Sequence, residues 1–258
     1  MNNKKRTARY WLSFIILAAL LVILFVWNVN AGSIHLSVGE ILNIIFRHQG
    51  DNTAYNIIWE IRLPRILAVI ILGGALSVSG FLLQTFFNNP IAGPFVLGIS
   101  SGAKLVVALL MIFFLSRSIS MGSAAMIIAA FIGSMISMGF VLLVAKKVHN
   151  MSMLVISGVM IGYICSAVTD FVVTFADDSN IVNLHNWSLG SFSGMSWANV
   201  RVMAVVVLLT MVIVFFMSKP IGAYQLGEVY AQNMGVNIKL FRVALILLSS
   251  ILSACVTA

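Results

Sequence analysis

The sequence predicts an all-α protein, a polytopic bundle of transmembrane helices with about seven helices in its 258 residues. Three observations lead to this fold class. Hydrophobic residues make up 61% of the chain and charged residues only 9%, far below the roughly 25% charge of soluble domains. The apolar residues gather in runs of about 20, the number that an α-helix needs to cross a bilayer core. Most of the Lys and Arg residues fall in the short gaps between these runs.

The first helix is expected from Tyr10 to Val29, directly after a basic N-terminal stretch. A basic stretch, an apolar run and the small residues Ala31 and Gly32 are also compatible with a cleaved signal peptide. The run is longer than the apolar region of a signal peptide, which has about 7–15 residues. We therefore favour a retained first helix.

The second helix is expected from Ile66 to Phe87, after a polar connection that contains one amphipathic piece, Val38 to Phe46. Asn89-Pro90 should end this helix, because proline lacks a donor and disfavours helical geometry in the residue before it. Pro220 is expected to end the sixth helix in the same way. The remaining apolar segments predict helices at Phe95–Leu115, Met121–Val144, Leu154–Phe175 and Val200–Met217, and one that starts near Phe241 and is still apolar at Ala258.

The distribution of charge predicts the topology. With the basic N-terminus in the cytoplasm, the inner gaps hold nine basic residues against one acid, Glu228, while the outer gaps hold five of each sign. The inner gaps therefore account for the whole net charge of +8, as expected for a multi-pass protein of a bacterial cytoplasmic membrane. A nucleic-acid partner is not indicated, since the basic residues line no polar face.

Several short motifs resemble, in order and spacing, the FecCD-like permeases, the membrane subunits of ABC importers for iron-siderophores, haem and vitamin B12. The resemblance implies a subunit of about ten helices, with a Gly-rich stretch after the position of Ala258. We therefore expect residues 1–258 to form a single transmembrane permease domain that is truncated at its C-terminus, as a fragment or a shortened gene product. The matching motifs are Arg62-Leu63-Pro64-Arg65, Gly80 with Gln84, Asn89-Pro90-Ile91-Ala92, Leu97-Gly98, Ser100-Ser101-Gly102, Leu226-Gly227-Glu228 and Gly235-Val236.

The resemblance also implies functional residues along the path. Arg62 and Arg65 would dock a substrate-binding lipoprotein or periplasmic protein, although two interfacial cations would look the same. Gly158 and Gly162 would line the substrate path, although their i, i+4 spacing is more simply explained by helix packing. Two inner turns would form a gate, although they are equally compatible with plain connectors; their residues are Asn89, Pro90, Ile91, Asn150, Met151 and Ser152.

A short amphipathic helix is expected at Leu226–Gly235. An apolar stripe recurs there at Leu226, Val229, Tyr230 and Met234, on a segment too short to span a bilayer. Glu228 would lie in the first turn, where the helix dipole favours an anion, and Gly235 would end the helix with a left-handed backbone conformation. In the family, the residues matching Glu228, Ala231 and Gly235 belong to the coupling helix, which sits in a cleft of the ATPase subunit.

No enzymatic motif is found: the sequence contains no P-loop, no HExxH and no nucleophile elbow. We expect no directly bound cofactor or metal, with ATP used by a separate ATPase subunit. The other expected partners are a second permease copy or paralogue and membrane lipid. The alternative is an ion-coupled secondary transporter or another non-ABC membrane protein, for which Lys104 and Asp170, the two ionisable residues inside apolar segments, give little support. A ferric siderophore is the expected cargo, because it is the commonest in the resembled family.

Overall fold

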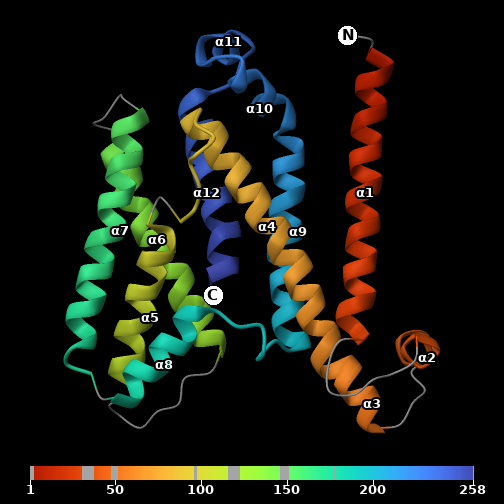
Figure 1. Ribbon diagram of the computed structural model, residues 1–258. Helices are drawn as coiled ribbons and strands as arrows, with labels where there is room; N and C mark the ends of the chain where they lie inside the picture. Colours follow the sequence, from red (N-terminus) through yellow and green to blue (C-terminus); the bar gives the residue numbers. More distant parts are fainter. Residues whose placement is uncertain are drawn as a thin grey trace. The chain divides into compact units, whose positions relative to one another are not determined.

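The computed structural model describes residues 3–30, 38–47, 52–95, 98–115, 123–145, 151–176 and 178–257. Within these ranges every regular element is a helix (Figure 1), as the fold class predicted. Contacts divide the chain into two compact units. The first comprises Met1–Ile70 and Phe192–Arg201, and the second comprises Ile71–Ser191 and Val202–Ala258.

Six helical segments of the described chain are long and apolar enough to cross a membrane. They are Lys5–Asn30, Thr53–Phe87, Ala125–Val144, Met153–Val173, Trp197–Phe216 and Ile238–Thr257. A seventh, shorter apolar helix covers Ile99–Phe114. The protein is therefore a multi-pass integral membrane protein, and the seven expected helices are present in the expected order.

The first unit contains α1 (Asn3–Asn30), the amphipathic α2 (Val38–Arg47), α3 (Asn52–Asn56) and the π-helical turn η1 (Ile57–Arg62). It also holds the beginnings of α4 (Leu63–Phe87) and α9 (Trp197–Phe216). Its core is formed by buried aliphatic side chains of α1, α2, η1 and α4, among them Val29, Ile44 and Ile58.

The prediction that the second helix begins at Ile66 is wrong. Helical structure starts at Asn52 and continues through η1 into α4 without a break. Pro64 lies inside this helix, just after the π-helical turn, where the Leu63 N–H bonds to the carbonyl of Ile58. A π-helical turn shifts the hydrogen-bond ladder, which lets the helix accommodate a proline that has no N–H to donate.

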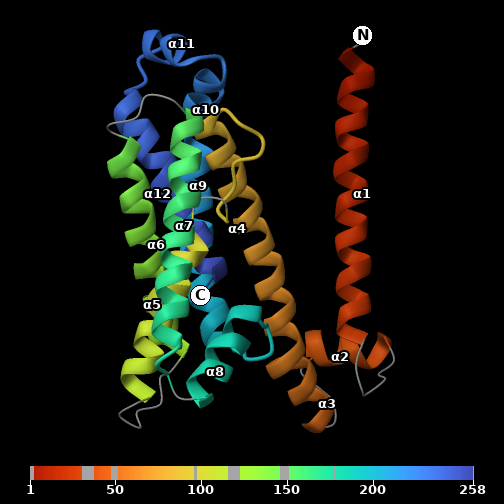
Figure 2. The ribbon, with the colours of Figure 1, turned by 60° about the vertical axis from the view of Figure 1, so that its left-hand side comes forward.

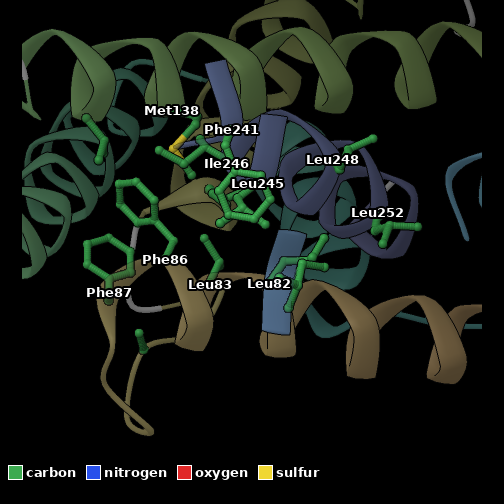
Figure 3. Close-up of a cluster of buried hydrophobic side chains, with 14 of the residues drawn as sticks. Leu82, Leu83, Phe86, Phe87, Met138, Phe241, Leu245, Ile246, Leu248 and Leu252 are labelled. Atoms are coloured by element: carbon green, nitrogen blue, oxygen red, sulfur yellow. The ribbon is translucent and has the colours of Figure 1, made fainter. Parts of the chain in front are cut away.

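The second unit contains the rest of α4 and α9 together with α5 (Ile99–Leu115), α6 (Ser123–Ala145), α7 (Met151–Val173), α8 (Asp178–Leu189), α10 (Ser218–Gln225), α11 (Glu228–Asn233) and α12 (Ile238–Thr257). α10 and α11 lie at one end of this unit and α8 at the other (Figures 1 and 2). The core at the α11 end is built mainly from α4 and α12 side chains that point toward one another (Figure 3), including Leu82, Leu83, Phe86, Leu245 and Ile246.

One further element was not predicted, and the predicted break of the sixth helix before Pro220 is confirmed. No helix was expected between those at Leu154–Phe175 and Val200–Met217, but α8 lies there and packs Leu184 against α5. The sixth helix ends at Phe216, and Pro220 lies in the first turn of a separate helix, α10. A proline ring clashes with the carbonyl four residues earlier, and that residue is Phe216, so the break falls one turn before Pro220.

Small residues let three helices approach closely in the second unit. A Cβ atom on Gly98, whose φ is +69°, would lie 2.8 Å from the backbone nitrogen of Gly162 in α7. One on Gly102 would lie 2.7 Å from the carbonyl oxygen of Gly133 in α6. The beginning of α5 is therefore wedged between α6 and α7, and the Ser137 hydroxyl donates to the Gly98 carbonyl at 2.9 Å.

Candidate functional site

The segment expected to contact an ATPase, Leu226–Gly235, contains α11 and directly follows α10, and neither helix belongs to the membrane-spanning segments. Gly227 (φ +128°) joins the two helices, and Gly235 (φ +85°) follows the end of α11. Residues other than glycine rarely adopt a positive φ. The predicted left-handed stop at Gly235 and the position of Glu228 in the first turn are confirmed. The helix itself, Glu228–Asn233, is shorter than the predicted Leu226–Gly235.

The apolar stripe of this segment points away from the protein. Leu226 and Val229 are each 73% exposed, Met234 is 65% exposed and Tyr230 is 48% exposed. Ala231 faces the other way and is fully buried in the core. The segment therefore presents an apolar surface of four side chains, Leu226, Val229, Tyr230 and Met234, which we call the α11 face.

Three polar side chains tie α10, α11 and α12 together. The Glu228 carboxylate forms an ion pair with Arg242 of α12 and accepts a hydrogen bond from the Tyr224 hydroxyl of α10 at 2.8 Å. The Arg242 Nε atom donates to the same hydroxyl at 3.2 Å. Burial raises the pKa of the Tyr224 hydroxyl above its ordinary value, an effect that the nearby Arg242 opposes. Tyr224 therefore stays protonated at neutral pH and can donate to Glu228.

Sequence reasoning identified Glu228 but missed Tyr224 and Arg242. The i, i+4 spacing of Tyr224 and Glu228 would place them on one side of a continuous helix, yet Gly227 separates the two helices here. Arg242 is one of the nine basic residues counted in the inner gaps, and its partner lies 14 residues away in the sequence.

The first predicted gate turn, after α4, has a defined structure. α4 ends at Phe87, and Asn88 adopts a positive φ of 46°. The Asn89 side-chain oxygen accepts the Ile91 N–H at 2.9 Å, and the Gln84 amide donates to the Pro90 carbonyl at 3.1 Å. Ile91 is 80% exposed. The turn therefore holds an aliphatic side chain outward on a fixed backbone.

The second predicted gate turn is described only in part. Asn150 lies outside the described residues, and Met151 and Ser152 form the start of α7. The end of α10 is bonded to the last turn of α4, just before the first gate turn: the Gln225 amide donates to the Thr85 hydroxyl at 3.2 Å, and the Thr85 carbonyl accepts the Asn88 N–H at 3.3 Å.

Gly158 and Gly162 are buried and face Gly98 at the beginning of α5. The helix-packing interpretation of their spacing is thereby confirmed. Their predicted role in lining a substrate path stays a prediction.

Arg62 and Arg65, the predicted docking residues, are half-buried in the first unit. Arg62 donates to the Val29 carbonyl near the end of α1 at 2.5 Å, where the helix dipole favours a cation. Arg65 donates to the Ser193 carbonyl at 2.7 Å.

These features define a multi-pass helical membrane protein with an ordered helix pair outside its spans, the architecture of a transport permease. The chain belongs to the FecCD transport family, whose model matches residues 20–258. It is a permease of the ABC importer class. This finding favours the ABC hypothesis over the ion-coupled alternative.

Similar proteins are named as permeases for different transported compounds. The hemin transport system permease HmuU of Yersinia pestis is 32% identical, over 99% of this chain and 75% of the relative. The vitamin B12 import system permease BtuC of Vibrio parahaemolyticus is also 32% identical, over 99% and 73%. The achromobactin transport system permease CbrC of Dickeya dadantii is 32% identical, over 94% and 69%.

A solved structure shares the fold. It is an inward-facing conformation assigned to a metal-chelate type ABC transporter, with a TM-score of 0.79 and 27% sequence identity. The match covers 94% of this chain and 73% of that one.

Proposed function

We propose that this permease carries a ferric siderophore from an extracytoplasmic binding protein to the cytoplasm, driven by ATP hydrolysis in a separate ATPase subunit. The chain itself binds no cofactor, and it pairs with a second permease copy or paralogue. Its N-terminus is cytoplasmic, which the excess of Lys and Arg in the inner gaps supports. The family membership and the names of the relatives support a large metal chelate or a similar compound as cargo.

The α11 face is the single observation that carries this proposal. An interfacial helix lying on lipid normally bears Lys and Arg on its polar side, whereas the exposed polar residues of α11 are Gln232 and Asn233. Its exposed apolar side chains therefore suit a cleft in a protein. Closure of two ATPase subunits would displace α11 and rock the permease halves between outward-facing and inward-facing states.

The decisive experiment measures ATPase retention. Val229→Asp with Met234→Asp should release the ATPase subunit from the complex in detergent or nanodiscs. Burying a Val or Met side chain contributes about 2 kcal/mol, so even one of the two losses should weaken the complex about 30-fold. Leu240→Asp is the control. It changes an equally exposed apolar side chain to Asp in the first turn of α12, outside α11. Wild-type retention by the double variant would exclude α11 as the docking helix.

The cargo is tested separately by uptake into cells or proteoliposomes that contain the full complex. Radioiron-loaded hydroxamate and catecholate siderophores, haemin and cyanocobalamin are compared at equal concentration. Accumulation of a ferric siderophore is expected. Uptake of only haemin or only cyanocobalamin would contradict the siderophore assignment and leave the ABC permease function intact.

Docking of the binding protein is assigned to Arg65 together with Arg62. Reversing both charges to Glu should weaken the complex mainly through its association rate, with a larger defect at low salt. Both arginines also bond backbone carbonyls, Arg62 that of Val29 and Arg65 that of Ser193, so the folding of each variant is checked alongside its affinity. Unchanged affinity in the double variant, at normal expression, would remove this assignment.

The gate is assigned to the turns at Asn89–Ile91 and Asn150–Ser152. Ile91 is exposed on a fixed turn, so cysteines at this position in two paired subunits should cross-link across the inner mouth. Cross-linking should block uptake while the binding protein still docks. Full transport after complete cross-linking would count against the gate.

A further inference from the structure

The six-residue helix α11 can transmit a displacement from the ATPase to the membrane-spanning helices only if it is fixed to them by contacts. α11 is joined to its neighbours through Gly227 and Gly235, both with positive φ. Short helices are marginal on their own in water, and the α11 face provides no intramolecular support because it is exposed. The rigidity of α11 must therefore come from its inward side.

The inward side is held by the three side chains that join α10, α11 and α12. Glu228 accepts from Tyr224 and pairs with Arg242, and Arg242 donates to Tyr224, so each member contacts the other two. Hydrogen bonds that involve charged groups are stronger than neutral ones. We call Tyr224, Glu228 and Arg242 the α11 brace.

The brace is anchored in the membrane-side core. The Tyr224 ring packs on Phe241 with their centroids 5.2 Å apart, and both residues are buried. Phe241 and Arg242 are neighbours in the first turns of α12. α12 in turn packs against α5 and α6, and its Leu245, Ile246 and Leu252 lie in the main core.

We propose that Tyr224, Glu228 and Arg242 are positioning residues that fix α11 to α12, so that displacement of α11 by the ATPase moves the spanning helices and the gate turn. This inference rests on the proposed function of α11. It assigns Glu228 an internal role, since its carboxylate points to Arg242 and Tyr224 within the chain. Removing the brace should therefore uncouple the ATPase from the permease without releasing it.

The experiment uses the full complex with its ATPase in nanodiscs, with Ile91→Cys as reporter in a background in which Cys165 and Cys255 are replaced by Ala. The labelling rate of this cysteine by a water-soluble maleimide is measured with and without ADP-vanadate. ATPase retention and the rate of ATP hydrolysis are measured on the same samples.

In Arg242→Gln and Glu228→Gln, the ATPase should be retained and should hydrolyse ATP, while the vanadate-dependent change in labelling falls by at least about fivefold. Tyr224→Phe keeps the ring packing on Phe241 and should give a smaller loss. The charge swap, Glu228→Arg with Arg242→Glu, should recover much of the change. Lys239→Gln removes the same charge from the same end of α12 and should behave as the wild type.

The outcomes separate the brace from the docking helix. The brace would be overturned if Arg242→Gln and Tyr224→Phe showed the wild-type change in labelling rate. It would also be overturned if Arg242→Gln released the ATPase to the same extent as Val229→Asp with Met234→Asp. If that double variant releases the ATPase while the brace variants change nothing, only the brace fails. If it retains the ATPase, the proposed function fails and the brace fails with it.

Discussion

Gly133→Ala should destabilise the contact between α5 and α6. A Cβ atom at this position would lie 2.8 Å from the carbonyl carbon of Gly102 and 2.9 Å from the Cα atom of Ala103, and closer still to the Gly102 oxygen. These are backbone atoms, so no rotamer change can relieve the overlap. Carbon atoms in contact normally lie about 3.5–4.0 Å apart, and the two helices must therefore separate by about 1 Å.

The magnitude follows from that separation. Overpacking of a close contact costs about 1–3 kcal/mol. A gap of about 1 Å also removes up to roughly half of the dispersion energy of the surrounding contacts. The bond from Ser137 to the Gly98 carbonyl, one turn away, would be stretched as well. Alanine recovers about 0.5–1 kcal/mol through its lower backbone entropy, so we expect a net loss of about 2–3 kcal/mol.

The assay is equilibrium unfolding in mixed micelles with a rising fraction of denaturing detergent, followed by tryptophan fluorescence. Gly139→Ala is the matched control in the same helix, because a Cβ atom there meets nothing within 4 Å. The control should stay within about 0.5 kcal/mol of the wild type or be slightly more stable. Equal stability of the two variants would show that α5 and α6 do not approach this closely.

Three further changes have calculable effects. Gly98→Ala combines a positive φ with a Cβ only 2.8 Å from the Gly162 nitrogen, and should cost about as much as Gly133→Ala in the same unfolding assay. Ser79 and Ser249 exchange hydrogen bonds between α4 and α12, and a double-mutant cycle to Ala should give a coupling energy of about 0.6–1.7 kcal/mol; a zero value would contradict the pairing. Trp197→Phe removes the donor to the Trp59 carbonyl at 2.8 Å and should lower the free energy of unfolding by about 1 kcal/mol; an unchanged value would contradict this bond.

The helix content and order could be predicted from the sequence because the bilayer fixes the length of an apolar run. The stop at Asn89-Pro90 and the left-handed Gly235 could be predicted for a local reason, since proline and glycine restrict or permit particular backbone angles. The packing of Gly158 and Gly162 followed from their spacing in the same way. These features depend on residues near one another in the chain.

The features that were missed depend on contacts between distant residues or on unusual backbone geometry. The continuous helix through Pro64 requires a π-helical turn, which no residue pattern marks. α8 has few apolar residues of its own, and Leu184 is buried only because α5 supplies the partner surface. The brace joins Glu228 to Arg242, and neither residue alone indicates the other.

The packing of α7 restricts which of its residues can face a substrate. Gly158 and Gly162 are turned toward α5, while the opposite side of the helix exposes Met160 and Ile164 at i and i+4. A path along that side would run over these two side chains. Met160→Ser with Ile164→Ser should therefore change uptake or cargo preference while leaving ATPase retention and folding near the wild type. Gly162→Ala would bring a Cβ to 3.2 Å from the Gly98 Cα and should instead reduce the free energy of unfolding. Unchanged uptake kinetics in the double serine variant, for every cargo tested, would show that α7 does not line the path.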